Sequence, residues 1–144
     1  MKPLMIILAL FFAVACKRSG QSVIITDKGN CENAISINAH KFSQPSPSAF
    51  QITKAAINGD CLEISISAGG CNGSTWQAAF VTNGAVAESF PPQMYFKVLL
   101  TNNEMCYAMP VRKFSYNLKP LRISGMQQVV LNVQGWNGQL IYQY

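Results

Sequence analysis

Hydrophobic and polar residues alternate along the chain from residue 50 onward, and this alternation predicts a series of β-strands. In residues 62–67, leucine and isoleucine alternate with glutamate and serine. Such a period of two places successive side chains on opposite faces of a half-buried strand. The other segments with this period are 50–57, 75–82, 93–101, 113–118, 128–134 and 140–144.

Turn residues separate these segments, and no segment has a convincing helical period. The separating pairs include Asn-Gly, Gly-Gly and Pro-Pro, which are typical of turns between strands. We therefore expect an all-β fold, a single antiparallel β-sandwich of about seven strands with an immunoglobulin-like arrangement. We expect this domain to span residues 49–144.

The N-terminus predicts an export signal. Lys2 precedes an apolar run over residues 4–14, which is too short to span a bilayer because a spanning helix takes about 20 residues. Residues 13–16, Ala-Val-Ala-Cys, fit an ordinary signal peptidase site and also resemble a bacterial lipobox, although Ala13 stands where leucine is usual. Cysteine parity favours the lipobox, because acylation of Cys16 leaves four cysteines that can pair.

We accordingly expect a lipoprotein signal peptide over residues 1–15, with fatty acyl chains such as palmitate on Cys16. Residues 16–48 have no clear period, and a proline- and serine-rich connector occupies residues 44–48. We expect this region to be a lipid-anchored tether followed by irregular structure. Within it, residues 33–40 are compatible with a strand or with a single helical turn.

The expected strand directions select one pairing of the remaining cysteines. Cys61 begins an upward strand and Cys71 follows its end, so about 3.3 Å per residue separates them by roughly 30 Å. A disulfide needs Cα atoms within about 7 Å, which excludes this pair. Cys106 follows a later upward strand and lies at the same end as Cys71. The prediction is therefore Cys31–Cys61 and Cys71–Cys106, and not a zinc site, which favours closely spaced cysteines.

Composition narrows the function classes. Apolar residues make up 49% of the chain and charged residues only 12%, which argues against disorder. The formal net charge of +5 is modest and scattered, so no nucleic-acid partner is expected. Several basic residues of the second half form either a solvated face or a patch for an acidic protein or an anionic polymer. These are Lys97, Arg112, Lys113, Lys119 and Arg122.

No catalytic motif is present, so we expect neither an enzyme nor a cofactor nor a metal site. His40 is interpreted as a loop residue and Glu63 as a solvated strand residue, and a hydrolase with two carboxylates far apart in sequence is the remaining enzymatic alternative. The glycine-rich residues 69–74 are interpreted as a disulfide-tied loop and not as an anion site. Trp76 is expected in the core, whereas Trp136 lies in a turn and is a possible ligand contact.

From Gly59 to Tyr144 the sequence resembles small lipoproteins of the Bacteroidota. The residues that carry this resemblance are Gly-Asp-Cys-Leu-Glu-Ile at 59–64, Gly-Gly-Cys at 69–71, the later Cys106, and Phe-Ser-Tyr-Asn-Leu-Lys-Pro-Leu at 114–121. The resemblance implies a β domain of the cell envelope and carries no activity. Lys17 and Arg18 differ from the acidic signal of surface-displayed lipoproteins, which favours the periplasmic side of the outer membrane.

The expected function is therefore that of an envelope lipoprotein acting as a binding or structural module without catalysis. Its partners are the membrane, through the lipid anchor, and an envelope protein or glycan. One alternative is an inhibitor of a periplasmic lysozyme or protease, in which a loop plugs the target site. Another is a glycan-binding module that uses Trp136.

Overall fold

The structure is a computed structural model that describes residues 23, 24 and 26–144. The expected signal peptide and the expected acylation site, Cys16, lie outside the described residues. Within the described part of the chain, no helix is long and apolar enough to cross a membrane.

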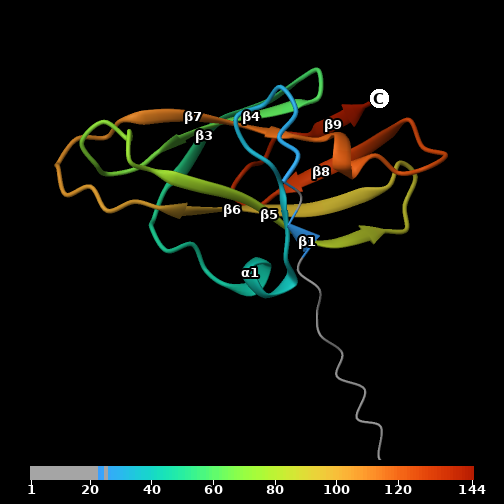
Figure 1. Ribbon diagram of the computed structural model, residues 1–144, viewed down its shortest axis with the longest axis horizontal. Helices are drawn as coiled ribbons and strands as arrows, with labels where there is room; N and C mark the ends of the chain where they lie inside the picture. Colours follow the sequence, from blue (N-terminus) through green and yellow to red (C-terminus); the bar gives the residue numbers. More distant parts are fainter. Residues whose placement is uncertain (1–22, 25) are drawn as a thin grey trace, which may run out of the picture.

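The described chain folds into two β-sheets, with one short helix outside them (Figure 1). The larger sheet has the strand order β1-β2-β5-β6-β8-β9, and the smaller sheet has the order β3-β4-β7. The strands are β1 (Val23–Ile24), β2 (Ser36–Ile37), β3 (Gln51–Asn58), β4 (Cys61–Ser67), β5 (Gln77–Ala87), β6 (Gln93–Thr101), β7 (Val111–Asn117), β8 (Gln128–Val133) and β9 (Leu140–Gln143). The helices are α1 (Ala39–Ser43) and a 3₁₀ turn, η1 (Lys119–Leu121).

The all-β class is confirmed, because each of the seven segments with a period of two forms a strand. In β4 and β6 alternate side chains are buried, as expected for strands with one face against a core. The bounds of β6 are those that the sequence predicts. In β8, by contrast, Val129, Val130 and Leu131 are all buried, so burial does not alternate strictly along this strand.

The purely antiparallel, immunoglobulin-like arrangement is not what the structure has. β2 pairs with β5 and β6 pairs with β8 in parallel. Between β6 and β8 the chain runs through β7 in the other sheet and back, so β8 returns in the direction of β6. A period of two places side chains on faces but does not say which strands become neighbours, and β1 and β2 are too short to give any period.

β5 is longer than predicted, because Asn83 and Gly84 form an irregularity within the strand and not a turn after it. The register with β6 shifts between Thr82 and Val86, and the strand continues to Ala87. Gly84 has φ +80°, and a Cβ at this position would lie 2.9 Å from Cγ2 of Ile37. A glycine is therefore needed where the side chain of Ile37 in β2 lies against this bulge.

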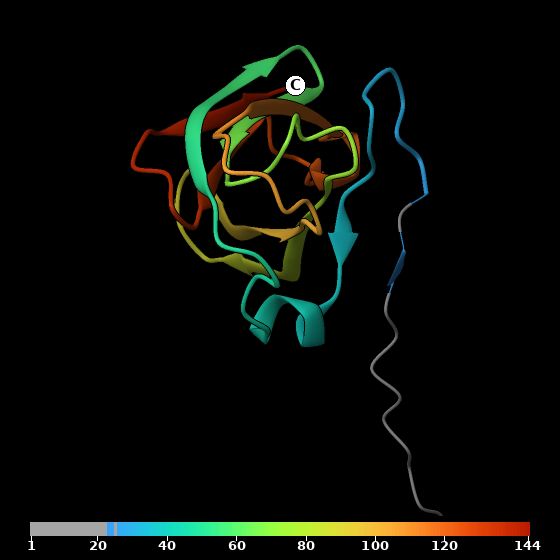
Figure 2. The same ribbon diagram turned by 90° about the vertical axis from the view of Figure 1, so that its left-hand side faces the viewer.

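The core lies between the two sheets, which face one another when seen along the long axis (Figure 2). Phe80 of β5 stacks on Phe96 of β6 with 4.7 Å between ring centroids, and Tyr116 of β7 packs on Phe80 at 5.2 Å. The hydroxyl of Tyr116 donates to the carbonyl of Ala78 at 3.0 Å. These contacts join the two sheets, and Trp76, 3% exposed, extends the same core.

Residues 26–48 are attached to the sheets more closely than an irregular tether would be. Ile35 is 1% exposed in the core, and Asn38 is the N-cap of α1, where its side chain accepts from the amide of Lys41. The helix lies against β5, on the outside of the larger sheet (Figure 1). Both possibilities for residues 33–40 are thus realised, as β2 and as the first turn of α1.

Both predicted disulfides are confirmed. Cys31–Cys61 has a Cα–Cα distance of 5.8 Å and ties the segment before β2 to the start of β4. Cys71–Cys106 has a Cα–Cα distance of 4.7 Å. It joins the loop after β4 to the loop after β6, and both loops lie at the left-hand end of the molecule in Figure 1.

Candidate functional site

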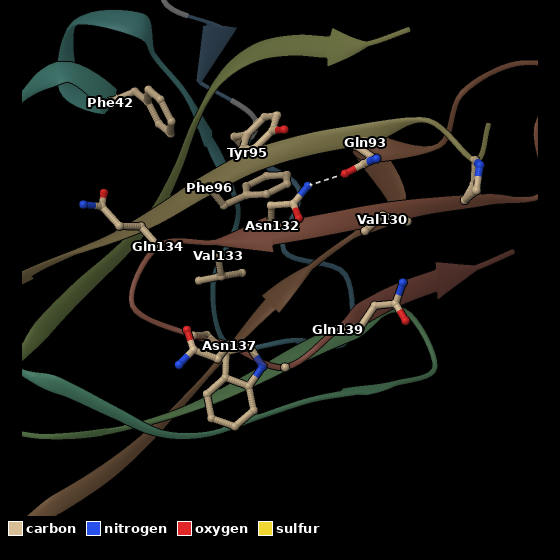
Figure 3. Close-up of a pocket in the computed structure, with 13 residues that line it drawn as sticks. Phe42, Gln93, Tyr95, Phe96, Val130, Asn132, Val133, Gln134, Asn137 and Gln139 are labelled. Atoms are coloured by element: carbon tan, nitrogen blue, oxygen red, sulfur yellow. Dashed lines mark hydrogen bonds between the residues drawn. The ribbon is translucent and has the colours of Figure 1, made fainter. Parts of the chain in front are cut away.

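The first candidate site is a groove of about 640 Å³ over the outer face of β6 and β8. We call it the amide groove, because five of its lining side chains are primary amides: Gln93, Asn132, Gln134, Asn137 and Gln139. The remaining lining residues are apolar or aromatic and none is charged: Phe42, Pro91, Tyr95, Phe96, Val130, Val133, Trp136 and Gly138. In Figure 3, Phe42 and Tyr95 lie on one side of the groove, and Asn137 and Gln139 lie on the other.

Most of the hydrogen-bonding capacity of the amide groove is free. The Nδ2 of Asn132 donates to the Oε1 of Gln93 at 3.0 Å, which fixes these two side chains (Figure 3). The side-chain amides of Gln134, Asn137 and Gln139 are exposed and make no hydrogen bond to another described residue. Each amide presents donors and an acceptor, so the groove offers both kinds of group to a ligand.

Trp136 lines the groove from the β8–β9 turn and is half-buried against the core. Its Nε1 is buried without a hydrogen-bond partner among the described residues. Gly138 lies directly against the ring, because a Cβ there would come within 2.5 Å of that nitrogen. The close packing of Gly138 fixes the indole in place.

The second candidate site is residues 105–111, which we call the clamped segment. Cys106 of this segment forms the disulfide to Cys71, and Ala108 exchanges two backbone hydrogen bonds with Gly70, at 3.0 and 3.2 Å. Both residues are themselves exposed. The odd-numbered residues are apolar and exposed. Their exposed fractions are 93% for Met105, 107% for Tyr107, 67% for Met109 and 60% for Val111.

Glu104, directly before the clamped segment, ties the two loops together through its carboxylate. Oε2 accepts from the amides of Cys71, Asn72 and Gly73 at 2.6, 3.1 and 3.0 Å. Oε1 accepts from the amide and the hydroxyl of Thr75 at 3.3 and 2.9 Å. Desolvation acts to raise the pKa of Glu104, but these hydrogen bonds outweigh it and lower the pKa to about 2. The glycine-rich loop is thus tied by its disulfide, as expected, and also holds an anion that the chain itself supplies.

A third cluster, around Asp60, joins the β3–β4 turn to the C-terminal strand. Oδ1 of Asp60 accepts from the hydroxyl of Tyr142 at 2.6 Å and from Arg122 at 2.7 Å, and Lys119 lies 3.7 Å from Oδ2. The hydrogen bond from Tyr142 lowers the pKa of Asp60 most, burial opposes it, and Arg122 adds to the lowering. These side chains are paired with one another within the fold, so the cluster is a brace between the β3–β4 turn and β9.

The basic residues singled out from the sequence are divided among separate internal contacts. Lys97 donates to the carbonyl of Gln44 and lies over the ring of Phe42. Arg112 donates to the carbonyls of Gly73 and Ser74, at 2.6 and 2.8 Å. Lys119 and Arg122 belong to the Asp60 cluster.

The two candidate acid–base residues lie apart. Glu63 pairs with Lys113 across β4 and β7 at 3.3 Å. His40 is exposed in α1 and not in a loop, and within the described residues no group of three or more metal-ligating side chains is present. Trp136, singled out from the sequence, lies in the groove with the amides. The role of Glu104 was missed, because its partners lie 29 to 33 residues away in the sequence.

No protein-family model matches this chain, and no curated protein matches it. Among solved structures, a protein of unknown function, DUF1344, from Bacteroides vulgatus is similar with a TM-score of 0.48 and 14% sequence identity. The similarity covers 74% of this chain and 52% of the other, so the chain spans about half the length of that protein. This weak likeness assigns neither an activity nor a ligand.

Proposed function

We propose that the protein is a lipid-anchored lipoprotein of the bacterial outer membrane, on its periplasmic side, that binds an envelope protein through the clamped segment and has no catalytic role. The two disulfides support the anchor, because they use four of the five cysteines and leave Cys16 in its lipobox-like sequence. They also suit an exported protein, since disulfides persist in oxidising compartments.

The observation that carries the binding role is the group of four exposed apolar side chains on the clamped segment, whose backbone is tied to the glycine-rich loop. The segment is held by a disulfide, a backbone pair and the adjacent Glu104 carboxylate, and it presents four exposed apolar side chains. Neighbouring large apolar side chains on a soluble surface are typical of an interaction site. Because the backbone is already held, little conformational entropy is lost on binding.

The shape and chemistry of the clamped segment define the partner. An exposed, uncharged segment whose backbone is held by a disulfide and a backbone pair fits an apolar cleft on another protein, whereas a bilayer does not require a fixed backbone. Burial of one large apolar side chain contributes about 1.5–3 kcal/mol. Met105 and Tyr107, the most exposed of the four, are therefore the expected anchors.

The proposal is tested by capture from envelope extract with the full chain. The variants are Met105→Asp and Tyr107→Asp, and the matched control is Phe90→Asp, since Phe90 is 90% exposed in the loop between β5 and β6. We expect one envelope protein to be captured at fixed stoichiometry by the wild type and by the control. Each aspartate variant should weaken this capture at least about tenfold.

Two outcomes would contradict the proposal: capture that is unchanged by both aspartate variants, and a wild-type chain that captures no protein in fixed stoichiometry. The alternative in which the segment plugs an enzyme has a separate readout. In that case the activity of the captured enzyme falls on titration with this protein and levels off at a one-to-one ratio.

A further inference from the structure

We propose that the amide groove binds a neutral carbohydrate. None of the thirteen lining residues carries a charge, in a chain that has 11 basic and 6 acidic residues. The clamped segment contributes no residue to the groove, so this inference is independent of the protein-binding role.

The five amides exclude the other main ligand classes. A purely apolar ligand would leave amide groups desolvated and unpaired, which costs free energy. A charged ligand would find no opposite charge among the lining residues. A neutral molecule with many hydroxyl groups fits, because each hydroxyl both donates and accepts, as each amide side chain does.

The aromatic residues that line the groove also fit a carbohydrate ligand. Tyr95 is 50% exposed, and Phe42 and Trp136 are half-buried, so the groove combines ring surfaces with amides. A sugar ring has a face of C–H groups bordered by hydroxyls, and it therefore needs apolar contact and hydrogen bonds in the same place. The volume of about 640 Å³ lies in the range of small-molecule sites, about 300–1,000 Å³.

A peptide, which also has neutral donors and acceptors, fits less well. Extended peptides commonly bind by adding a strand to an exposed sheet edge. The strands beneath the groove have no such edge, since β6 pairs with both β5 and β8, and β8 pairs with both β6 and β9. A ligand over these strands meets side chains and no open sheet edge, which suits a saccharide.

The groove is largely preformed. Gln93 and Asn132 are bonded to each other, Phe96 beneath them is 1% exposed, and Gly138 fixes the ring of Trp136. The exposed amides of Gln134, Asn137 and Gln139 remain to adjust to the ligand. The ring of Trp136 is held in place and the exposed amides can change position, so the groove can distinguish one neutral sugar from another.

The test is isothermal titration calorimetry on the full chain, in a detergent without a sugar headgroup. The probes are cellotetraose, maltotetraose, xylotetraose and chitotetraose, with tetragalacturonate as the charged probe and a neutral tetrapeptide as the peptide probe. We expect at least one neutral tetrasaccharide to bind, and the charged and peptide probes not to bind.

Groove variants and matched controls locate the binding. Tyr95→Ala should weaken it about tenfold, and Gln139→Ala about three- to tenfold, as expected for one ring contact and one hydrogen bond. Both side chains are exposed to solvent and neither makes a hydrogen bond to a described residue, so both variants should fold. Phe90→Ala and Asn103→Ala change an exposed aromatic residue and an exposed asparagine that do not line the groove, and should leave affinity unchanged.

The inference is overturned if no neutral tetrasaccharide binds at millimolar concentration, if Tyr95→Ala and Gln139→Ala bind as the wild type does, or if the charged or peptide probe binds more tightly than every sugar. The protein-binding role does not depend on these results, because its variants lie in the clamped segment.

Discussion

Removal of the Cys71–Cys106 disulfide should lower the free energy of unfolding by about 3.8 kcal/mol. The bridge joins residues 35 apart, and in the chain-entropy model a loop of that length gives this value. The double variant Cys71→Ser/Cys106→Ser avoids a free thiol. Because both positions are exposed, the serine hydroxyls are not desolvated, and the change should act on the unfolded chain.

The native loop should survive the substitution, since Glu104 and the Gly70–Ala108 pair still hold it. The assay is urea unfolding followed by tryptophan fluorescence, with near-ultraviolet circular dichroism as a check on the native state. Trp76 is a suitable reporter because its ring lies 3.2 Å from a Cβ built on Gly70. The expected result is a lower midpoint with an unchanged native spectrum.

The matched variant is Cys31→Ser/Cys61→Ser. Its bridge joins residues 30 apart, for which the same model gives about 3.6 kcal/mol. Cys31 is only 6% exposed, so a serine there adds a native-state cost, and this variant should lose at least as much stability as the first. A loss below about 1 kcal/mol for Cys71→Ser/Cys106→Ser, or the reverse order of the two variants, would refute the reasoning.

Four further results are expected. Glu104→Gln should lower the melting temperature most above about pH 5. The pKa of Glu104 is lowered from 4.5 to about 2, so its carboxylate stabilises the fold above its usual pKa. This contribution is lost as the pH falls toward 2. Thermal scans should therefore show the difference from wild type shrinking toward pH 2, and a constant difference would contradict it. Tyr116→Phe should cost about 1–2 kcal/mol in urea unfolding, because the carbonyl of Ala78 loses its donor; an unchanged midpoint would count against that bond. Gly138→Ala should change the fluorescence of Trp136, since the added Cβ would lie 2.5 Å from Nε1, whereas Gly69→Ala, with nothing within 4 Å, should not. Metabolic labelling with a clickable fatty acid should mark the wild type and not Cys16→Ser, and equal labelling would exclude this anchor.

The strands and the disulfides could be predicted because both follow from spacing along the chain. The spacing of apolar residues indicates the strands, and the length and direction of each strand indicate which cysteines can meet. The period of two in residues 62–67 and 93–101 is direct sequence information on which side chains are buried. The direction of each strand then decides which loops share an end, and this was enough to pair Cys71 with Cys106. Both inferences need only the length and the polarity of each segment.

The neighbours of each strand could not be predicted in the same way. The parallel pairs β2–β5 and β6–β8 arise from excursions of the chain through the other sheet, and no local pattern records them. The bulge at Asn83 and Gly84 has the sequence of a turn, but β5 continues through it and pairs with β6 again at Val86 and Ala87.

The candidate sites were only partly accessible from the sequence. Trp136 could be singled out because a tryptophan in a turn is unusual, but the amides around it come from β6, β8 and the turn after β8. Glu104 is a single acidic residue in a loop, and nothing near it in the sequence marks the five hydrogen bonds it accepts.

The distribution of charge in the fold explains why both proposed surfaces are neutral. Most of the described acidic side chains are used in internal contacts: Glu32 with Arg112, Asp60 with Arg122, Glu63 with Lys113, and Glu104 with the glycine-rich loop. Neither the clamped segment nor the amide groove contains a charged residue. Recognition at both surfaces therefore depends on apolar burial and neutral hydrogen bonds, which salt does not screen as it screens exposed charges. Specificity must then come from shape and hydrogen-bond geometry, and both surfaces have the rigid support that this requires: a disulfide and a carboxylate behind one, and the interior strands of a sheet beneath the other.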